Sequence, residues 1–333
     1  MTSPSHRTGA LLLTFGLLAA AYGDDPATDV DAVEEDSEDL AVDETETDDS
    51  DDGTESIEAE TADADEVPAD APGSDLIGRE SNVADGVPEF YSRYFRCTDI
   101  SVDGDVVVIV GTNLPPHLSY YWGEGSDLFE EFDYSRGDRY RPNPNVIAET
   151  NLVLRIPLDP VEAGITVDSD TVNLATGDDT DYPFGPAGVG LDGVALFNPL
   201  AAPGDDIEDE KYTFDSYEGH PENRGVYHYH AVALGPLTVL QSLGFTTSDV
   251  PGVAEIELYG VMCDGTIVMG VSELDGTTAD TDLDAQAGHV HDISDTDGTV
   301  LLENRYHIHM ASTIGAEPRG LTPEAQFYST CDI

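Results

Sequence analysis

The sequence predicts a mainly β fold, a single sandwich- or barrel-like domain that follows a disordered acidic N-terminal segment. Short β-branched and apolar runs recur along the second part of the chain, and turn-forming Asp-Gly pairs separate several of them. No long stretch shows the period of an amphipathic helix. We therefore expect a signal peptide at 1–23, a linker at 24–75 and a β-rich domain at 76–333.

Residues 1–23 have the composition of an export signal. A polar start is followed by an apolar run, and Ala21-Tyr22-Gly23 offers a cleavage site. The run is shorter than the roughly 20 apolar residues that a transmembrane helix needs. The segment is also similar to a bacterial lipoprotein signal, but Tyr22 stands where the lipid-bearing cysteine is required. We expect a protein without a transmembrane segment that is secreted or held in the periplasm or cell envelope.

Residues 24–75 contain 24 acidic side chains, no Lys or Arg, and almost no large apolar side chains. Such a segment cannot bury enough surface to offset the entropy lost on ordering. We predict an extended linker that repels itself.

The charge of the chain excludes one class of partner. Its 69 acidic and 12 basic residues give a formal net charge of −57. Proteins that bind nucleic acid need clustered Lys and Arg to displace counterions, so we expect no nucleic-acid partner. An anionic membrane surface would repel the chain for the same reason.

The predicted strands of the domain are apolar runs that stop at turn residues. Val106–Val110 stops at Gly111 and Leu152–Ile156 stops at Pro157, and both have the composition of buried strands. The other predicted strands span 165–174, 193–197, 226–234, 254–262, 266–271 and 300–310.

Histidines carry the chemical signal of the sequence. Seven of the nine lie between residues 220 and 309, and six of them form His-x-His pairs. Side chains two residues apart on a strand project from the same face, so both imidazoles of a pair can reach one metal ion. We predict four metal ligands, His228, His230, His307 and His309, and expect His220, His289 and His291 to complete one or two sites. The alternate residues, Tyr227, Tyr229, Tyr306 and Ile308, would then face the core.

Neutral imidazoles without thiolates suit copper or zinc, and copper is slightly preferred because it leads the divalent affinity order. The alternative is that carboxylates of this acidic chain satisfy the histidines as ion pairs. A calcium ion is a further candidate, because Asp280-Thr281-Asp282-Leu283-Asp284 has the opening of a calcium loop. That loop has Ala285 where glycine is expected, so an ordinary acidic turn is the competing interpretation. Asp284 or Asp292 would then orient a ligating imidazole.

The same region resembles the YHYH domain family over residues 186–310. The resemblance rests on the tetrapeptide Tyr227–His230, the preceding Gly219-His220, the glycine-rich 190–194, the hairpin 259–270 and the closing Tyr306–His309. It implies a secreted bacterial protein and no established reaction. The sequence also contains a short internal echo, because Glu-Asn-Arg precedes both Tyr227–His230 and Tyr306–His309. Coincidence and an old duplication both explain so short a match.

Three functions fit these observations. The first is an exported protein that holds copper or zinc through its His-x-His pairs. The second is a metal-dependent oxidase or hydrolase at the same histidines, with Asp264 or Asp284 as acid or base. The third is an adhesion or ligand-binding module in which the histidines are structural. The sequence leaves open whether the chain is an enzyme and whether it has a protein partner.

The three cysteines fit one disulfide and one buried thiol. Segments at the two ends of a domain often lie close together. We therefore expect Cys97 to pair with Cys331.

Overall fold

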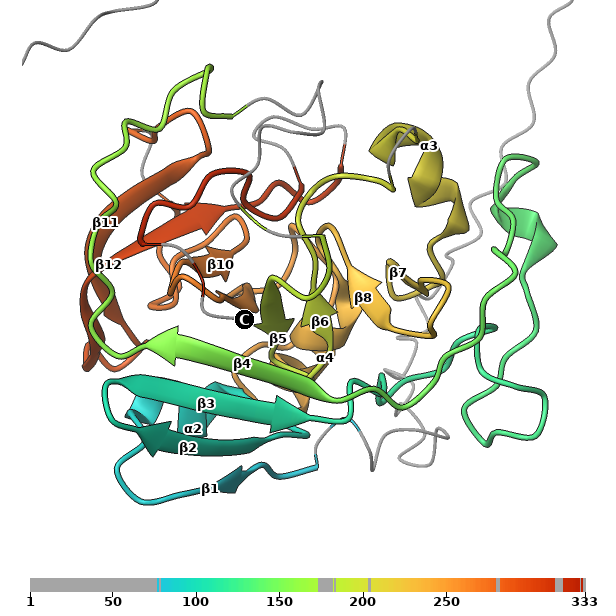
Figure 1. Cartoon of the computed structure of the whole chain (residues 1–333), viewed down its shortest axis with the longest axis horizontal. Helices are drawn as coiled ribbons and strands as arrows, with labels where there is room; N and C mark the ends of the chain where they lie inside the picture. Colours follow the sequence, from blue (N-terminus) through green and yellow to red (C-terminus); the bar gives the residue numbers. More distant parts are fainter. Residues whose placement is uncertain are drawn as a thin grey trace, which may run out of the picture. The chain divides into compact units, whose positions relative to one another are not determined.

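The structure is a computed structural model that describes residues 77, 79–172, 182, 184–202, 205–279, 282–314, 320–329 and 331. All of them lie in one unit, Asp65–Ile333. The predicted signal peptide and linker lie outside the described residues. The prediction of a mainly β fold is confirmed, since the described residues form two sheets and no closed barrel (Figure 1).

The smaller sheet has four strands in the order β1-β2-β3-β4. Their bounds are Asn82–Val83, Asp99–Asp103, Val106–Gly111 and Leu152–Pro157. β3 and β4 were expected as buried strands, but burial alternates along both, and only the face that carries Val107, Ile109 and Leu154 is fully buried. The reason is that this sheet covers the core with one face, together with helix α2 (Glu89–Tyr94).

The larger sheet has eight strands in the order β11-β12-β10-β9-β5-β6-β8-β7. In chain order they are β5 (Gly188–Gly190), β6 (Ala195–Leu196), β7 (Gly219–Pro221), β8 (Tyr227–Tyr229), β9 (Leu258–Met262), β10 (Ile267–Met269), β11 (Gly288–Ser294) and β12 (Val300–His309). β5 to β10 are buried throughout, because one hydrophobic cluster joins this sheet to the smaller one.

The two halves of the larger sheet repeat one topology. Each half has an antiparallel hairpin, β5–β6 or β9–β10, whose second strand pairs in parallel with the second strand of β7–β8 or β11–β12. Counted inward from either edge of the sheet, equivalent strands therefore follow in the same order. At the seam, β5 and β9 pair antiparallel around Val189 and Val261. Gly188 and Gly260 bring the two backbones close there, because a Cβ on either would collide with a carbonyl of the other strand.

Short helical segments connect these strands: η1 (Tyr134–Arg136), α3 (Ile207–Glu210), η2 (Lys211–Thr213) and α4 (Leu234–Ser242). α4 was not predicted, because its apolar residues lie all around it and no stripe of helical period results. The strand predicted at 226–234 is shorter than expected, because only Tyr227–Tyr229 form β8 and helix α4 begins at Leu234. The strand predicted at 165–174 is absent from the described residues 165–172. No helix among the described residues is long and apolar enough to cross a membrane.

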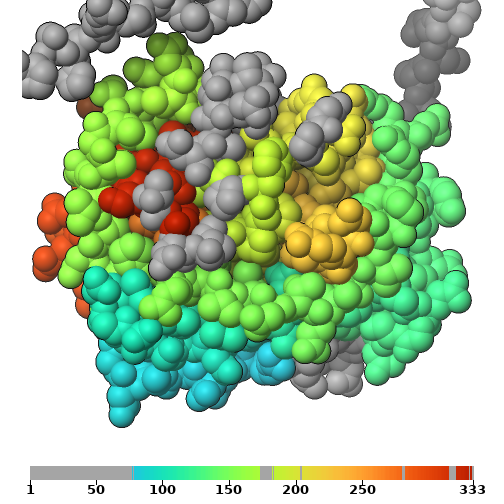
Figure 2. All heavy atoms as spheres, in the orientation of Figure 1, coloured from blue at the N-terminus to red at the C-terminus, as the bar shows by residue number. Residues whose placement is uncertain are grey.

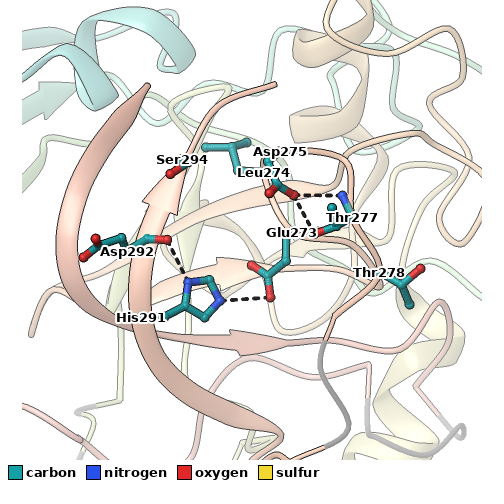
Figure 3. A pocket seen from close by; sticks show the side chains of 8 residues that line it. All are labelled: Glu273, Leu274, Asp275, Thr277, Thr278, His291, Asp292 and Ser294. Carbon is teal, nitrogen blue, oxygen red and sulfur yellow. Dashed lines mark hydrogen bonds and ion pairs between the residues drawn. The ribbon is translucent and has the colours of Figure 1, made fainter. Parts of the chain in front are cut away.

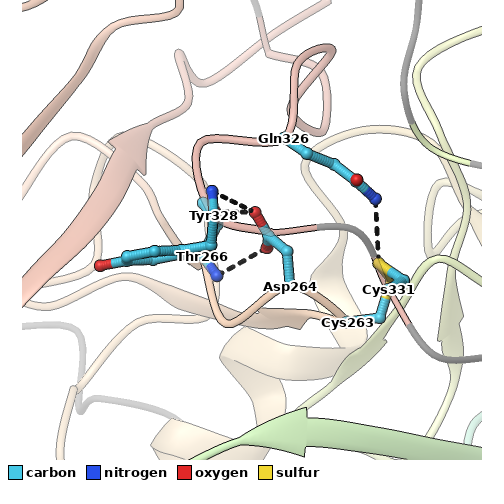
Figure 4. The surroundings of a disulfide bond; sticks show 6 residues. All are labelled: Cys263, Asp264, Thr266, Gln326, Tyr328 and Cys331. Atoms are coloured by element: carbon cyan, nitrogen blue, oxygen red, sulfur yellow. Dashed lines mark hydrogen bonds between the residues drawn. A yellow bond between two sulfur atoms is a disulfide. The ribbon is translucent and has the colours of Figure 1, made fainter. Parts of the chain in front are cut away.

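The expected Cys97–Cys331 disulfide is wrong. Cys331 pairs instead with Cys263, whose Cα lies 5.3 Å from that of Cys331 (Figure 4). Cys263 follows β9 directly, and Asp264 beside it accepts the backbone N–H of Tyr328 at 3.3 Å. The C-terminal segment therefore lies along the β9–β10 turn. Cys97 lies outside this disulfide, next to Arg79 and Gly193.

Candidate metal centres

The structure gathers the seven predicted histidines into two separate clusters. The strands that carry them, β7–β8 and β11–β12, lie at opposite edges of the larger sheet (Figure 1). The first cluster consists of His220, His228 and His230, carried by β7 and β8. The second consists of His289, His291, His307 and His309, carried by β11 and β12, together with Glu273. Four strands separate the edge pairs, so the pairs His228/His230 and His307/His309 do not share a site.

Strand register explains why each cluster forms. In the first, His220 lies directly opposite His228 on the neighbouring strand, and His230 follows two residues later on the same face. In the second, His289 lies opposite His307, and His309 follows two residues after it. The glycine before His220 or His289 belongs to the same register, since Gly219 pairs with Tyr229 and Gly288 with Ile308.

The imidazoles of the first cluster converge on one point. Nε2 of His228 lies 3.1 Å from Nε2 of His220 and 3.0 Å from Nε2 of His230. Two nitrogens bound at about 2.0–2.1 Å to one tetrahedral zinc ion lie about 3.3 Å apart. The spacing of the three nitrogens therefore fits a shared metal ion.

The opposite ring nitrogens fix the tautomers of this cluster. His228 Nδ1 lies 2.9 Å from the carbonyl of Val226, and His230 Nδ1 lies 2.6 Å from that of Asn198. A carbonyl only accepts, so both Nδ1 atoms carry the proton and both Nε2 atoms present lone pairs. Thr213 hydroxyl donates to the Glu210 carbonyl and so accepts from His220 Nδ1, which gives the third ring the same tautomer. Three lone pairs face one another unless a cation lies between them.

Protons do not supply that cation at neutral pH. Burial, and then the neighbouring imidazoles, lower the pKa of His228 and His220 well below the usual range. Burial lowers the pKa of His230 to about 4. The cluster is therefore a set of neutral imidazole donors, which copper and zinc accept.

Glu210 adds a carboxyl group to the edge of the first cluster. Its Oε1 lies 3.5 Å from His220 Nε2, and its Oε2 is buried without a hydrogen-bond partner. Burial, with the nearby Asp205, raises the pKa of Glu210 to about 7. Figure 2 shows α3, which carries Glu210, beside the 115–145 segment on this face of the molecule, and Arg139 contacts Asp209 at 2.6 Å across that boundary.

The second cluster surrounds the carboxylate of Glu273. Nε2 atoms of His289, His291 and His309 lie 3.2, 3.2 and 3.1 Å from its Oε1. Nε2 of His307 lies 3.3 Å from its Oε2, yet this buried nitrogen makes no hydrogen bond. One carboxylate and four imidazoles therefore point at the same volume.

Tautomers again leave lone pairs at the centre. Nδ1 of His291, His307 and His309 lies 2.7, 3.0 and 2.8 Å from the carbonyls of Asp292, Arg305 and Gly270 respectively. Because each Nδ1 proton is donated to a carbonyl, the Nε2 atom of each ring, in its neutral form, presents a lone pair to a carboxylate that cannot donate. In neutral rings such an arrangement is repulsive without a cation and attractive around one.

The pKa values at the second cluster keep the carboxylate of Glu273 charged and the rings of His289 and His307 neutral. Burial acts to raise the pKa of Glu273, but the surrounding imidazoles of His307 and His309 outweigh it and hold that pKa below its usual range. Burial, then the neighbouring His307, lowers the pKa of His289 to about 4. The centre is thus anionic at neutral pH and fits a divalent cation.

Matching contacts support the histidines in the two halves. The hydroxyl of Tyr227 donates to Asp215 at 2.8 Å, and that of Tyr306 donates to Asp284 at 2.8 Å. A Cβ at Gly219 or at Gly288 would collide with the respective tyrosine hydroxyl. The same aspartates also accept the N–H of these glycines. Together with the repeated topology, these contacts favour duplication over coincidence as the origin of the sequence echo.

The alternate residues of the strands lie as expected, since Tyr227, Tyr229, Tyr306 and Ile308 are all buried in the core. Five of the seven histidines are buried as well, whereas His289 and His291 of the second cluster are half-buried. His117, outside both clusters, has its Nε2 3.0 Å from the Tyr229 hydroxyl and is a core histidine.

The carboxylates singled out in the sequence have other partners. Asp264 is buried and binds Thr266 and Tyr328, and the side chain of Asp284 binds Tyr306, so neither lies at a histidine cluster as an acid or base. Asp292 does orient an imidazole, through its backbone carbonyl. The proposed calcium loop falls partly outside the described residues, at 280 and 281. Glu273 and Glu210 were missed, because nothing distinguishes them in the sequence from the many other acids.

Solvent reaches the second cluster through a pocket lined by polar residues (Figure 3). Glu273 and His291 form its inner wall, and Asp275, Asp292 and Thr277 lie around them. The His291 side chain is 38% exposed, whereas that of His220 in the first cluster is 4% exposed.

Comparison with known families gives one match. The family model described as YHYH protein matches residues 156–294, which confirms the resemblance predicted from the sequence. The match covers the first cluster, Glu273, His289 and His291, and ends before β12. No curated protein and no solved structure matches the chain.

Proposed function

We propose that the protein, whose residues 156–294 match the YHYH family model, is an exported binder of copper or zinc that holds one ion in each histidine cluster. Copper is preferred, as the divalent ion with the highest affinity for imidazole sites. The predicted signal peptide at 1–23, the linker at 24–75 and the domain from 76 onward are part of this proposal. The Cys263–Cys331 disulfide supports export, because such bonds persist in oxidising compartments.

The observation that carries the proposal is the convergence of unprotonated Nε2 atoms. In the first cluster three such atoms lie 3.0–3.1 Å from their neighbours, each fixed by a hydrogen bond at Nδ1. This arrangement costs free energy in the apo protein and is compensated when an ion occupies the centre. Histidines satisfied as ion pairs would instead need protonated rings, which the lowered pKa values of His220, His228 and His230 oppose.

Metal analysis tests the proposal. The full chain, purified without chelator and reconstituted separately with Cu²⁺ and Zn²⁺, should retain about two ions per chain after gel filtration. The double variant His228→Ala/His230→Ala should retain about one, as should His307→Ala/His309→Ala. His117→Gln, which alters a buried histidine outside both clusters, should retain the full content. Retention of well under one ion per chain by the wild-type protein, for copper, zinc, nickel and iron alike, would contradict the proposal.

The pocket favours one second candidate, a metal-dependent oxidase or hydrolase at the second cluster. Catalysis by a bound ion needs a position that substrate can reach, and the pocket offers one beside Glu273 and His291. Glu273→Gln should then abolish any turnover of the metal-loaded protein, while the matched Glu210→Gln at the first cluster should not. Equal turnover in Glu273→Gln and wild type would remove this candidate.

A further inference from the structure

The repeated scaffold makes the two clusters directly comparable. Its equivalent residues are His220 and His289, His228 and His307, and His230 and His309, each pair placed by the same strand register. The third ring of each cluster donates from Nδ1 to a carbonyl at the end of the parallel neighbour, Asn198 or Gly270. Differences between the clusters therefore come from residues outside this shared set.

The first difference is His291. β11 continues past His289 and places this ring on the same face two residues later. The equivalent position after His220 is Glu222, which lies just beyond the end of β7 and binds Arg224 with its carboxylate, 3.1 Å from Nε. The second cluster thus gains an imidazole, at its solvent side, that the first lacks.

The second difference is Glu273. It follows the carbonyl-bearing Gly270 by three residues, and the residue three positions after Asn198 is Ala201, which has no donor atom. The second cluster therefore has an anionic ligand at its centre. The first has only Glu210 at its margin, with Oε1 3.5 Å from His220 Nε2.

The third difference is shielding. In the first cluster Phe197 stacks on His228 with 3.7 Å between ring centroids, and Phe214 packs edge-on against His220 at 4.9 Å. In the second cluster, the ring contacts of the histidines among described residues are with one another. The pocket of Figure 3 opens on the Glu273 carboxylate and on His291.

We infer that the two centres have different roles: the first retains its ion behind aromatic rings, and the second exchanges its ion with solvent and presents it to a small uncharged ligand. This inference rests on the proposed function. Four imidazoles and one carboxylate leave a sixth position on an ion that takes six ligands, and the pocket leads to that side of the cluster. In solvent access alone, the enclosed first centre resembles structural metal sites and the open second centre resembles catalytic or exchanging ones.

The charge of the pocket defines the class of ligand. Asp275 and Asp292 line it with carboxylates, and the chain as a whole carries a formal charge of −57. Cations are drawn to such a mouth and anions are repelled, so the ion loads readily and the added ligand is neutral. A free imidazole molecule is a suitable probe, and azide is its anionic counterpart.

Chelator competition tests the difference in access. The full chain loaded with Zn²⁺ is mixed with excess 4-(2-pyridylazo)resorcinol, and zinc release is followed by absorbance. We expect two phases of equal amplitude, with the fast one at least about tenfold faster, a difference of about 1.4 kcal/mol in barrier. His291→Ala should remove or accelerate the fast phase alone, and His228→Ala the slow phase alone. Glu222→Gln, at the position equivalent to His291, should leave both unchanged.

Two measurements on the wild-type chain do not depend on the variants folding. Diethyl pyrocarbonate should modify His291 of the apo protein at least about tenfold faster than His228 or His230, because a fully buried ring is reached only when the fold opens. The Cu²⁺-loaded protein should change its d–d absorption with imidazole at concentrations where azide has no effect.

The outcomes separate the two claims. Release in a single phase of two ions, equal labelling of the two clusters, or a stronger response to azide than to imidazole would overturn the inference and leave the proposed function in place. A chain that retains no metal overturns the proposed function, and the inference with it.

Discussion

Tyr227→Phe removes the hydroxyl that binds Asp215 next to the first histidine cluster and leaves the aromatic ring in place. That hydroxyl lies 2.8 Å from both carboxylate oxygens of Asp215, a buried residue. A hydrogen bond to a charged group contributes about 1.5–3 kcal/mol and one to a neutral group about 0.5–1.5 kcal/mol. Asp215 keeps Ser119 and two backbone N–H donors in the variant, so we expect the low part of each range.

Burial raises the pKa of Asp215 to about 6, and its hydrogen bonds oppose that rise. Since this folded-state pKa lies above the unfolded value, the stability contributed by Asp215 is present at low pH and is lost as pH rises through about 6. The carboxylate is charged above that pH, so its hydrogen bond with the Tyr227 hydroxyl is strongest there. We therefore expect Tyr227→Phe to lower the free energy of unfolding by about 2 kcal/mol at pH 7.5 and about 1 kcal/mol at pH 4.5.

Urea unfolding of the apo protein, followed by near-ultraviolet circular dichroism at both pH values, measures this difference. Tyr134→Phe serves as control, since Tyr134 is exposed, and should change the free energy of unfolding by less than about 0.5 kcal/mol. A loss in Tyr227→Phe that equals the control, or that is larger at pH 4.5 than at pH 7.5, would refute the reasoning.

Three other predictions concern the fold. Gly260→Ala places a Cβ against the Val189 carbonyl at the seam of the two halves, and should lower the free energy of unfolding by about 3 kcal/mol or more, measured by urea unfolding. Burial lowers the pKa of His117 to about 3, so the stability that its neutral ring contributes is present above pH 6.5 and is lost as pH falls toward 3. In His117→Gln, the thermal midpoint should therefore fall less between pH 7 and pH 4 than in the wild type. An equal fall in the variant and the wild type would count against this role of His117. Cys331→Ser opens the loop closed with Cys263 and should cost about 4 kcal/mol, whereas a midpoint equal to that of Cys97→Ser would show that the disulfide contributes nothing.

The sequence predicted the strands that contain a continuous apolar run and a clear stop. β3 and β4 fall on Val106–Val110 and Leu152–Ile156 because β-branched residues and the following glycine or proline act locally. β5 and β7, of three residues each, could not be predicted, because their pairing with distant strands defines them. The same holds for the Cys263–Cys331 disulfide, which depends on where the C-terminal segment lies.

The candidate site was predictable in its ligand type and only partly in its arrangement. Spacing of two on a strand placed the imidazoles of His228 and His230 together, and likewise those of His307 and His309. Which pair joins His220 and which joins His289 depends on strand register across turns, which the sequence does not specify. Glu273 enters through the same long-range register and carries no local signal.

The central claim is that each histidine cluster holds one transition-metal ion. Its most direct test is the metal content of the wild-type chain after Cu²⁺ or Zn²⁺ reconstitution and gel filtration, determined by inductively coupled plasma mass spectrometry. We predict about two ions per chain, falling to about one when either His228/His230 or His307/His309 is replaced by alanine. A wild-type chain that elutes folded and essentially free of metal would contradict the account.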